Sequence, residues 1–195
     1  MYKRQCQDSE DCNGNGIPDR CETLHDCNEN GIPDECEFLG LEAVCWGRSD
    51  ENQCASVSGP TYRLLDAGRD FTVGLSLDGD LFAWGVNGDG QTDLPDIQDV
   101  REVSAGWWHA LALLDDGQVV GWGSNQFGQS VPPENLRALK ISAGDEHNLA
   151  IDTSGEVVAW GSNTFGQCDV PELGVCLEVS AGGQHSVAIR GDGTL

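Results

Sequence analysis

Basic residues are scarce in this chain. Lysine and arginine contribute 10 of the 195 residues, aspartate and glutamate contribute 33, and the formal net charge is −23. Proteins that bind DNA or nucleosomes present a basic surface to the phosphate backbone. The composition therefore excludes nucleic acid as the expected partner. Acidity of this kind, spread over the whole chain, keeps an exported protein in solution.

Long apolar runs and helical periodicity are also missing. No stretch approaches the roughly 20 apolar residues that span a bilayer as a helix, so membrane insertion is not expected. Met1-Tyr2-Lys3-Arg4 does not lead into the apolar segment of a signal peptide. We still expect secretion, because of the cysteine pattern described below, with the export signal upstream of this segment. No nucleophile elbow, phosphate loop or catalytic carboxylate pair is present, so the chain is predicted not to be an enzyme.

A repeat of 38 residues organises the chain from about residue 44 onward. Ala-Gly begins at residues 67, 105, 143 and 181, and Trp-Gly begins at residues 46, 84, 122 and 160. A fixed period in this range indicates one supersecondary unit stacked on copies of itself.

Each unit consists of short apolar runs joined by tight turns. In the second full unit, residues 109–114 and 118–123 flank Asp115-Asp116-Gly117, and Asp-Gly between two apolar runs is a strong hairpin signal. A Gly/Asn-rich loop follows. Val131-Pro132-Pro133 is at best an edge strand, because proline cannot donate to a ladder, and residues 139–142 form the next strand. Three or four strands per unit predict an all-β fold, a β-propeller.

The repeated pattern is Ala-Gly-x-x-His-x-Leu-Ala followed by Asp-Gly-x-Val-x-x-Trp-Gly-x-Asn-x-x-Gly-Gln. Over residues 44–195 it resembles the regulator of chromosome condensation repeat. The short units are most similar to bacterial members of that family, which include a secreted β-lactamase inhibitor. The resemblance implies that Trp84, Trp122 and Trp160 pack between blades, and that such propellers usually have seven blades. The acidity departs from the chromatin-bound member, so nucleotide exchange on a small GTPase is not expected.

The repeats, assigned to residues 41–195, amount to about four blade-lengths with half a blade at each end. Trp46 to Gln53 matches Trp84 to Gln91, and the last unit stops before its own Trp-Gly. Two interpretations remain open. The favoured one is an incomplete propeller that is part of a longer ring with an unpaired last edge; the other is a four-bladed ring closed by the two half-blades.

Residues 1–40 carry a different chemistry, two tandem twelve-residue calcium loops. Oxygen-bearing side chains stand at positions 1, 3, 5, 9 and 12, glycine stands at position 6, and isoleucine at position 7 offers its carbonyl. The match therefore predicts calcium as the cofactor. The predicted ligands are Asp11, Asn13, Asn15, Ile17, Asp19 and Glu22 in the first loop, and Asp26, Asn28, Asn30, Ile32, Asp34 and Glu37 in the second.

These loops are not EF-hands, because only Thr23-Leu24-His25 separates them and that is too short for a helix. The form Asp-Cys-Asn-x-Asn-Gly-Ile-Pro-Asp-x-Cys-Glu resembles thrombospondin type 3 repeats, and the resemblance implies that calcium is structural. Asparagine in place of aspartate at positions 3 and 5 lowers the ligand charge, which predicts weak affinity suited to extracellular calcium.

Nine cysteines accompany these features, at positions 6, 12, 21, 27, 36, 45, 54, 168 and 176. The seven before residue 60 are spaced by 6 or 9 residues, in step with the calcium loops, which favours disulfides and an oxidising compartment. Zinc is the weaker alternative, because no Cys-x2-Cys pair occurs and hard oxygen ligands dominate. Candidate bridges are Cys6–Cys12, Cys21–Cys27, Cys45–Cys54 and Cys168–Cys176, and the sequence does not fix the connectivity.

The repeat also supplies candidate site residues. His109, His147 and His185 recur at the repeat period, but Phe71 occupies the same place in the first full unit. The histidines are therefore interpreted as structural residues that bond neighbouring backbone.

Loops 125–129 and 163–167, with Trp107 and Trp108, are the candidate recognition surface. We predict an extracellular, non-enzymatic interaction module, a propeller on a calcium-ordered stalk, with a protein or cell-surface ligand as partner. The alternatives are an inhibitor of a secreted enzyme and the accessory part of a larger secreted hydrolase.

Overall fold

The computed structural model describes residues 43–54 and 61–191, and the chain divides into two units, Met1–Glu42 and Ala43–Leu195. All the described strands are antiparallel, and the described residues form no helix of a length and apolarity that would cross a membrane. The prediction of an all-β chain is confirmed.

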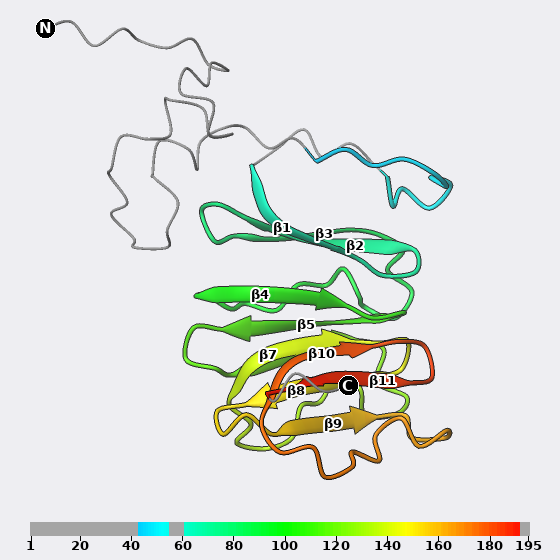
Figure 1. Ribbon diagram of the computed structural model, residues 1–195. Coiled ribbons are helices and arrows are strands. Elements are labelled where there is room, and N and C mark those ends of the chain that lie inside the picture. The colour runs from blue at the N-terminus through cyan, green and yellow to red at the C-terminus, as the bar shows by residue number, and fades with distance from the viewer. Residues whose placement is uncertain (1–42, 55–60, 192–195) are drawn as a thin grey trace, which may run out of the picture. The chain divides into compact units, whose positions relative to one another are not determined.

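The strands form three sheets of three strands and one sheet of two, which we call blades one to four (Figure 1). Corresponding strands of successive blades lie one repeat apart. Blade one holds β1 (Tyr62–Ala67), β2 (Phe71–Ser76) and β3 (Leu81–Gly85); blade two holds β4 (Val100–Ala105), β5 (His109–Leu114) and β6 (Val119–Gly123); blade three holds β7 (Ala138–Ala143), β8 (His147–Asp152) and β9 (Val157–Gly161); blade four holds β10 (Cys176–Ala181) and β11 (Ser186–Arg190).

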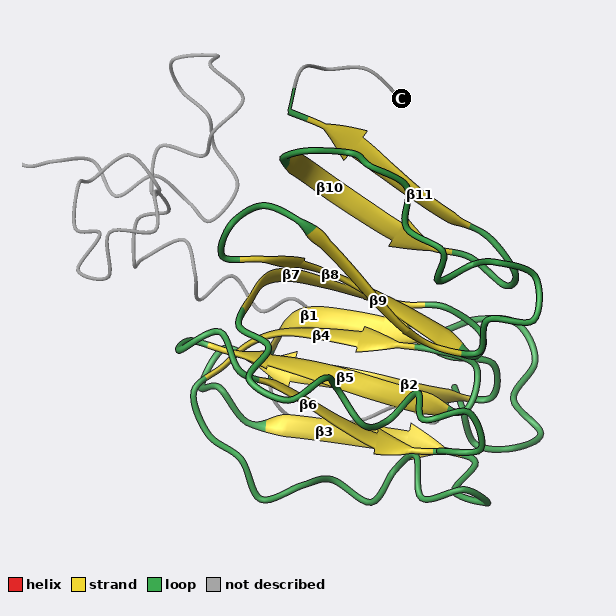
Figure 2. Ribbon diagram, turned by 90° about the horizontal axis from the view of Figure 1, so that it is seen from below, coloured by secondary structure: helices red, strands yellow, loops and turns green. Residues whose placement is uncertain are grey.

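Each blade packs face to face against the next, and the first strands β1, β4, β7 and β10 contact one another in turn. The described residues are drawn as strands and loops alone (Figure 2). This succession is part of a β-propeller, as predicted. Each complete blade has three strands, because the segment around Pro132 and Pro133 forms no strand. Proline lacks the N–H that an outer strand would donate.

The core lies between the blades rather than inside one of them. Because alternate residues of a strand face opposite sides, Leu111 and Leu113 of β5 point toward blade three, while Ala110 and Ala112 point toward blade one. Large side chains on one blade thus meet small ones on the next. The same arrangement recurs at all three interfaces, so each blade depends on its neighbours to bury its two faces.

Tryptophan joins each blade to the one before it. The Trp122 indole Nε1–H donates to the backbone carbonyl of Gln91 at 2.9 Å, and the Trp160 indole donates to the carbonyl of Gln129 at 3.0 Å. Trp84 does the same to Gln53, in the half-blade formed by residues 43–54. The predicted packing of these tryptophans between blades is confirmed.

The recurring histidines join each blade to the one after it. His109 is fully buried and its Nε2 lies 2.7 Å from Oδ1 of Asn148, while Nε2 of His147 lies 2.9 Å from Oγ of Ser186. His109 and His147 are structural, as predicted, but their partners are side chains of the next blade rather than backbone, and the third predicted histidine, His185, is exposed. Burial lowers the pKa of both His109 and His147, so each ring is neutral at pH 7.

A third set of contacts links the first strands. Oδ2 of Asp66 accepts from the N–H of Ala105 at 2.8 Å, and Oγ of Ser104 accepts from the N–H of Ala143 at 3.0 Å. The glycine after each of these alanines permits this approach: a Cβ on Gly144 would collide with the carbonyl oxygen of the next glycine in the series. Only glycine fits between blades packed this closely.

The two half-blades do not join. Within the described residues, β11 pairs only with β10, and Trp46 is 85% exposed instead of packing on blade four. The interpretation as a closed four-bladed ring is therefore wrong, and the described residues form an open, partial propeller.

The cysteines of the described residues form one bridge rather than two. Cys45 and Cys54 are disulfide-bonded, as predicted, whereas the proposed Cys168–Cys176 bridge is wrong and both thiols are free. Cys176 fills the first core position of β10, which Val100 holds in blade two, and packs among apolar residues. Cys168 instead lies in a loop with its Sγ 3.3 Å from the carbonyl of Ser162. The other cysteines lie outside the described residues.

Blade one supplies a template for testing the histidine contact, because Phe71 faces Ala110 where His109 faces Asn148. His109→Phe leaves Oδ1 of Asn148 buried without a donor, which is expected to destabilise the protein by ~1–3 kcal/mol. The pair His109→Phe/Asn148→Ala recreates the first interface and is expected to recover part of this loss. Urea unfolding measures both values.

The same variants test the lowered pKa. A histidine whose folded pKa is depressed stabilises the fold above its unfolded pKa, near 6.5, and that stability is lost as the pH falls through the folded value. The double variant is therefore expected to lose less stability than the parent between about pH 7.5 and about pH 5. Equal losses in the two proteins would contradict the assignment.

Candidate protein-recognition surface

Two series of loops meet at one end of the blades. One series, 68–70, 106–108 and 144–146, joins the first strand of each blade to the second; the other, 86–91, 124–129 and 162–167, follows the third strand. Ser124 N–H donates to the carbonyl of Trp108 at 2.8 Å, and Ser162 N–H donates to that of Glu146 at 2.8 Å. The structure thus brings the predicted loops and tryptophans onto a single surface, which we call the loop face.

Invariant polar side chains inside the repeat hold the second series of loops in shape. Oδ1 of Asn163 accepts from the N–H of Cys168 at 2.8 Å, and Oε1 of Gln167 accepts from the N–H of Phe165 at 2.8 Å. Asn87 and Gln91 make the same two bonds in blade one. These loops are preformed by the scaffold and need no partner to order them.

The tips of the loops, by contrast, are not the same in every unit. Phe127 is 46% exposed and Phe165 is 63% exposed, and Asp89 stands at the same position in the first unit. Neither phenylalanine contributes to the cores between blades. A rigid frame with exposed, variable tips is how binding loops are commonly presented.

Trp107 and Trp108 form the aromatic part of the first loop series. Both are partly exposed, and their ring centroids lie 6.3 Å apart at 35°. The guanidinium of Arg69, from blade one, lies 4.5 Å from the Trp107 ring and 5.1 Å from the Trp108 ring, within cation–π range. Arg69 was not among the predicted site residues, although it stands one repeat before Trp107.

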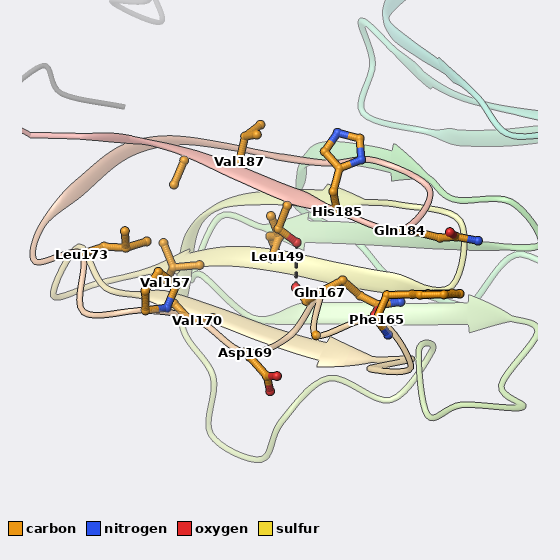
Figure 3. A pocket seen from close by; sticks show the side chains of 14 residues that line it. Leu149, Val157, Phe165, Gln167, Asp169, Val170, Leu173, Gln184, His185 and Val187 are labelled. Atoms are coloured by element: carbon orange, nitrogen blue, oxygen red, sulfur yellow. Dashed lines mark hydrogen bonds between the residues drawn. The ribbon is translucent and has the colours of Figure 1, made fainter.

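A groove of about 490 Å³ opens between blades three and four, lined by Leu149, Val157, Phe165 and Val187 among others (Figure 3). At the interface between blades two and three, the corresponding space is filled by Trp160 and lined by Leu111 and Val119. In the groove the Gln167 carbonyl accepts from the Ser186 hydroxyl at 2.7 Å. The groove therefore belongs to the blade-to-blade packing of the fold.

No catalytic grouping emerges from the described residues. His109 and His147 are buried in the blade interfaces, and His185 is exposed. In residues 43–54 and 61–191, no three histidine, cysteine, aspartate or glutamate side chains gather as metal ligands. The predicted calcium ligands, from Asp11 to Glu37, lie outside the described residues, so calcium binding stays a prediction.

Three segments of the chain, residues 63–91, 100–129 and 139–167, match the family described as Regulator of chromosome condensation (RCC1) repeat. A search of curated proteins gives no significant match. Together with the fold, the three matches show that these segments are similar to RCC1 repeats and lie in successive blades of a partial β-propeller.

Solved structures agree with this fold. Prp20p from Saccharomyces cerevisiae matches with 23% identity and a TM-score of 0.60, over 70% of this chain and 44% of its own. The ectodomain of the receptor kinase CR4 from Physcomitrella patens matches with 20% identity and a TM-score of 0.67, over 78% of this chain and 45% of its own. The CRINKLY WD40 ectodomain of the Arabidopsis thaliana receptor kinase ACR4 matches with 21% identity and a TM-score of 0.63, over 78% of this chain and 53% of its own. This chain spans about half the length of these structures.

Proposed function

We propose that this chain is a non-enzymatic protein-interaction scaffold that binds its partner through the loop face. The observation that carries the proposal is that the buried positions of the repeat are constant while positions at the loop tips are not. Buried positions such as Gln91 and Gln129 are the same in every unit and hold the blades together, whereas the loop tip carries Asp89 in one unit and the exposed Phe127 and Phe165 in the next two. Exposed aromatic residues on a rigid frame are typical of binding surfaces.

Proteins of similar fold support a binding role. The structural study of Prp20p also describes its binding properties to Gsp1p and histones, and yeast RCC1 (Prp20) has been solved with Kap60 bound. These partners belong to those proteins. What carries over to this chain is the use of the propeller as a platform for another protein.

We further propose that residues 1–40 form an extracellular stalk ordered by two calcium ions. The support is the donor set: five side-chain oxygens and one carbonyl at calcium-loop spacing, twice in tandem, with glycine at the turn position. A segment this short buries little apolar surface, so a metal and disulfides would replace the missing core.

Calorimetric titration of the oxidised full chain with calcium tests the stalk. About two sites in the micromolar to millimolar range are expected. Asp11→Ala/Asp26→Ala should abolish them, because it removes the first ligand of each loop. Asp115→Ala/Asp116→Ala, which removes the same charge from the turn after β5, should leave them intact. Absence of binding, or equal losses in both variants, would contradict calcium loops.

Photo-cross-linking tests the scaffold function. A benzoyl-phenylalanine at position 127 or 165 is expected to capture the same extracellular or cell-surface protein, because both positions lie on the loop face. The matched control is position 153, an exposed residue in the turn after β8, at the opposite end of the blades. Capture should fall in Trp107→Ala/Trp108→Ala. Capture that is equal at all three positions would contradict recognition by the loop face.

A further inference from the structure

We propose that Trp107 and Trp108, with Asp145 and Glu146 of the next blade, form a docking site for a basic peptide segment. In this site a lysine or arginine of the partner stacks on the indoles while the carboxylates neutralise its charge. The inference rests on the proposed scaffold function and names the chemistry of the partner.

Arg69 already shows what this aromatic pair binds. Its guanidinium lies over both indoles, at 4.5 and 5.1 Å from the ring centroids, while its Nε lies 3.4 Å from Oδ2 of Asp70. A cation held on aromatic faces beside a carboxylate is the arrangement that a bound lysine or arginine adopts. Both indoles remain partly exposed around this internal cation, so they offer further surface to a partner.

The two residues after each Ala-Gly form a row across the loop face. From blade one to blade four they are Arg69-Asp70, Trp107-Trp108, Asp145-Glu146 and Gly183-Gln184. The backbone N–H of Trp107 donates to the backbone carbonyl of Asp145 at 3.3 Å, which fixes the acidic pair directly beside the aromatic pair. The carboxylate of Asp145 lies beside Gly183, which has no side chain of its own to cover it, and Asp145 is partly exposed.

The negative charge of this row favours a basic partner. In this row three carboxylates face one guanidinium, and Asp70 is occupied by Arg48 at 3.3 Å as well as by Arg69. Asp145 and Glu146 form no ion pair with a described lysine or arginine within 4.0 Å. A basic segment gains from these free carboxylates, whereas an acidic peptide is repelled. Tryptophans also stack on sugars, whose hydroxyls can donate to carboxylates, but a neutral sugar does not compensate the negative charge of this row as a basic segment does.

Nuclear magnetic resonance of the six indole N–H groups provides the test. The oxidised chain of residues 1–195 is titrated with acetyl-Lys-Arg-Lys-Arg-amide, and the two indoles are assigned with Trp107→Phe and Trp108→Phe. We expect the signals of Trp107 and Trp108 to shift, and those of Trp122 and Trp160, which are bonded inside the blade interfaces, to stay in place. An acetylated tetraglutamate and a chitin trisaccharide serve as the comparison ligands.

Charge-matched variants separate a site from general acidity. Asp145→Asn/Glu146→Gln is expected to weaken binding of the basic peptide about fivefold, whereas Asp115→Asn/Asp116→Asn changes it by less than about twofold. Arg69→Gln should strengthen binding, because it removes the cation that occupies the indoles. Arg137→Gln, which removes a charge next to the Asp116-Gly117 turn, should not.

Three results would overturn the inference: no shift of either indole with the basic peptide, a shift with the trisaccharide alone, or equal weakening by the two pairs of acidic substitutions. None of these bears on the scaffold function, which is tested separately by cross-linking at Phe127 and Phe165. Failure of that cross-linking with an intact indole response would remove the larger function and leave the cation site.

Discussion

The hydrogen bond from the indoles of Trp84, Trp122 and Trp160 to the glutamine backbone carbonyl of the preceding unit is the contact on which the structure depends. A blade of three short strands cannot bury both of its faces, so it is stable only when stacked. The indole contributes a large apolar surface to the seam and one polar group that fixes its position. The indole reaches the carbonyl of Gln91 or Gln129 in only one relative position of two neighbouring blades. The bond therefore fixes that position as well as stabilising it.

Polar groups inside the seams serve the same purpose. His109 and Asn148 are both fully buried, and they bond each other across the second interface. Left without a partner, either side chain would destabilise the folded state more than a mismatched apolar contact does. The pair therefore disfavours any other arrangement of the two blades. With the frame fixed by buried residues, the loop face is free to differ from blade to blade. The proposed recognition surface is a consequence of that freedom.

The repeat period made much of the fold predictable. Ala-Gly, Asp-Gly and Trp-Gly at a constant spacing predicted the strand order and the hairpin turns, and the family resemblance predicted the packing of Trp122 and Trp160 between blades. The period did not give the partners of the histidines, because Asn148 and Ser186 occupy a position that holds Thr72 and Ala110 in other blades. The predicted disulfide at Cys176 was wrong, because a thiol can also fill a small core position, here the one that valine or alanine fills in blades two and three.

Unfolding free energies of Trp122→Phe and Trp46→Phe test the central claim most directly. The substitutions are chemically identical, but Trp122 is buried and donates to the Gln91 carbonyl, whereas Trp46 is 85% exposed. The account predicts a loss of ~1–3 kcal/mol for Trp122→Phe, because the carbonyl loses its donor, and almost none for Trp46→Phe. Equal and small losses would show that apolar packing alone holds the blades together.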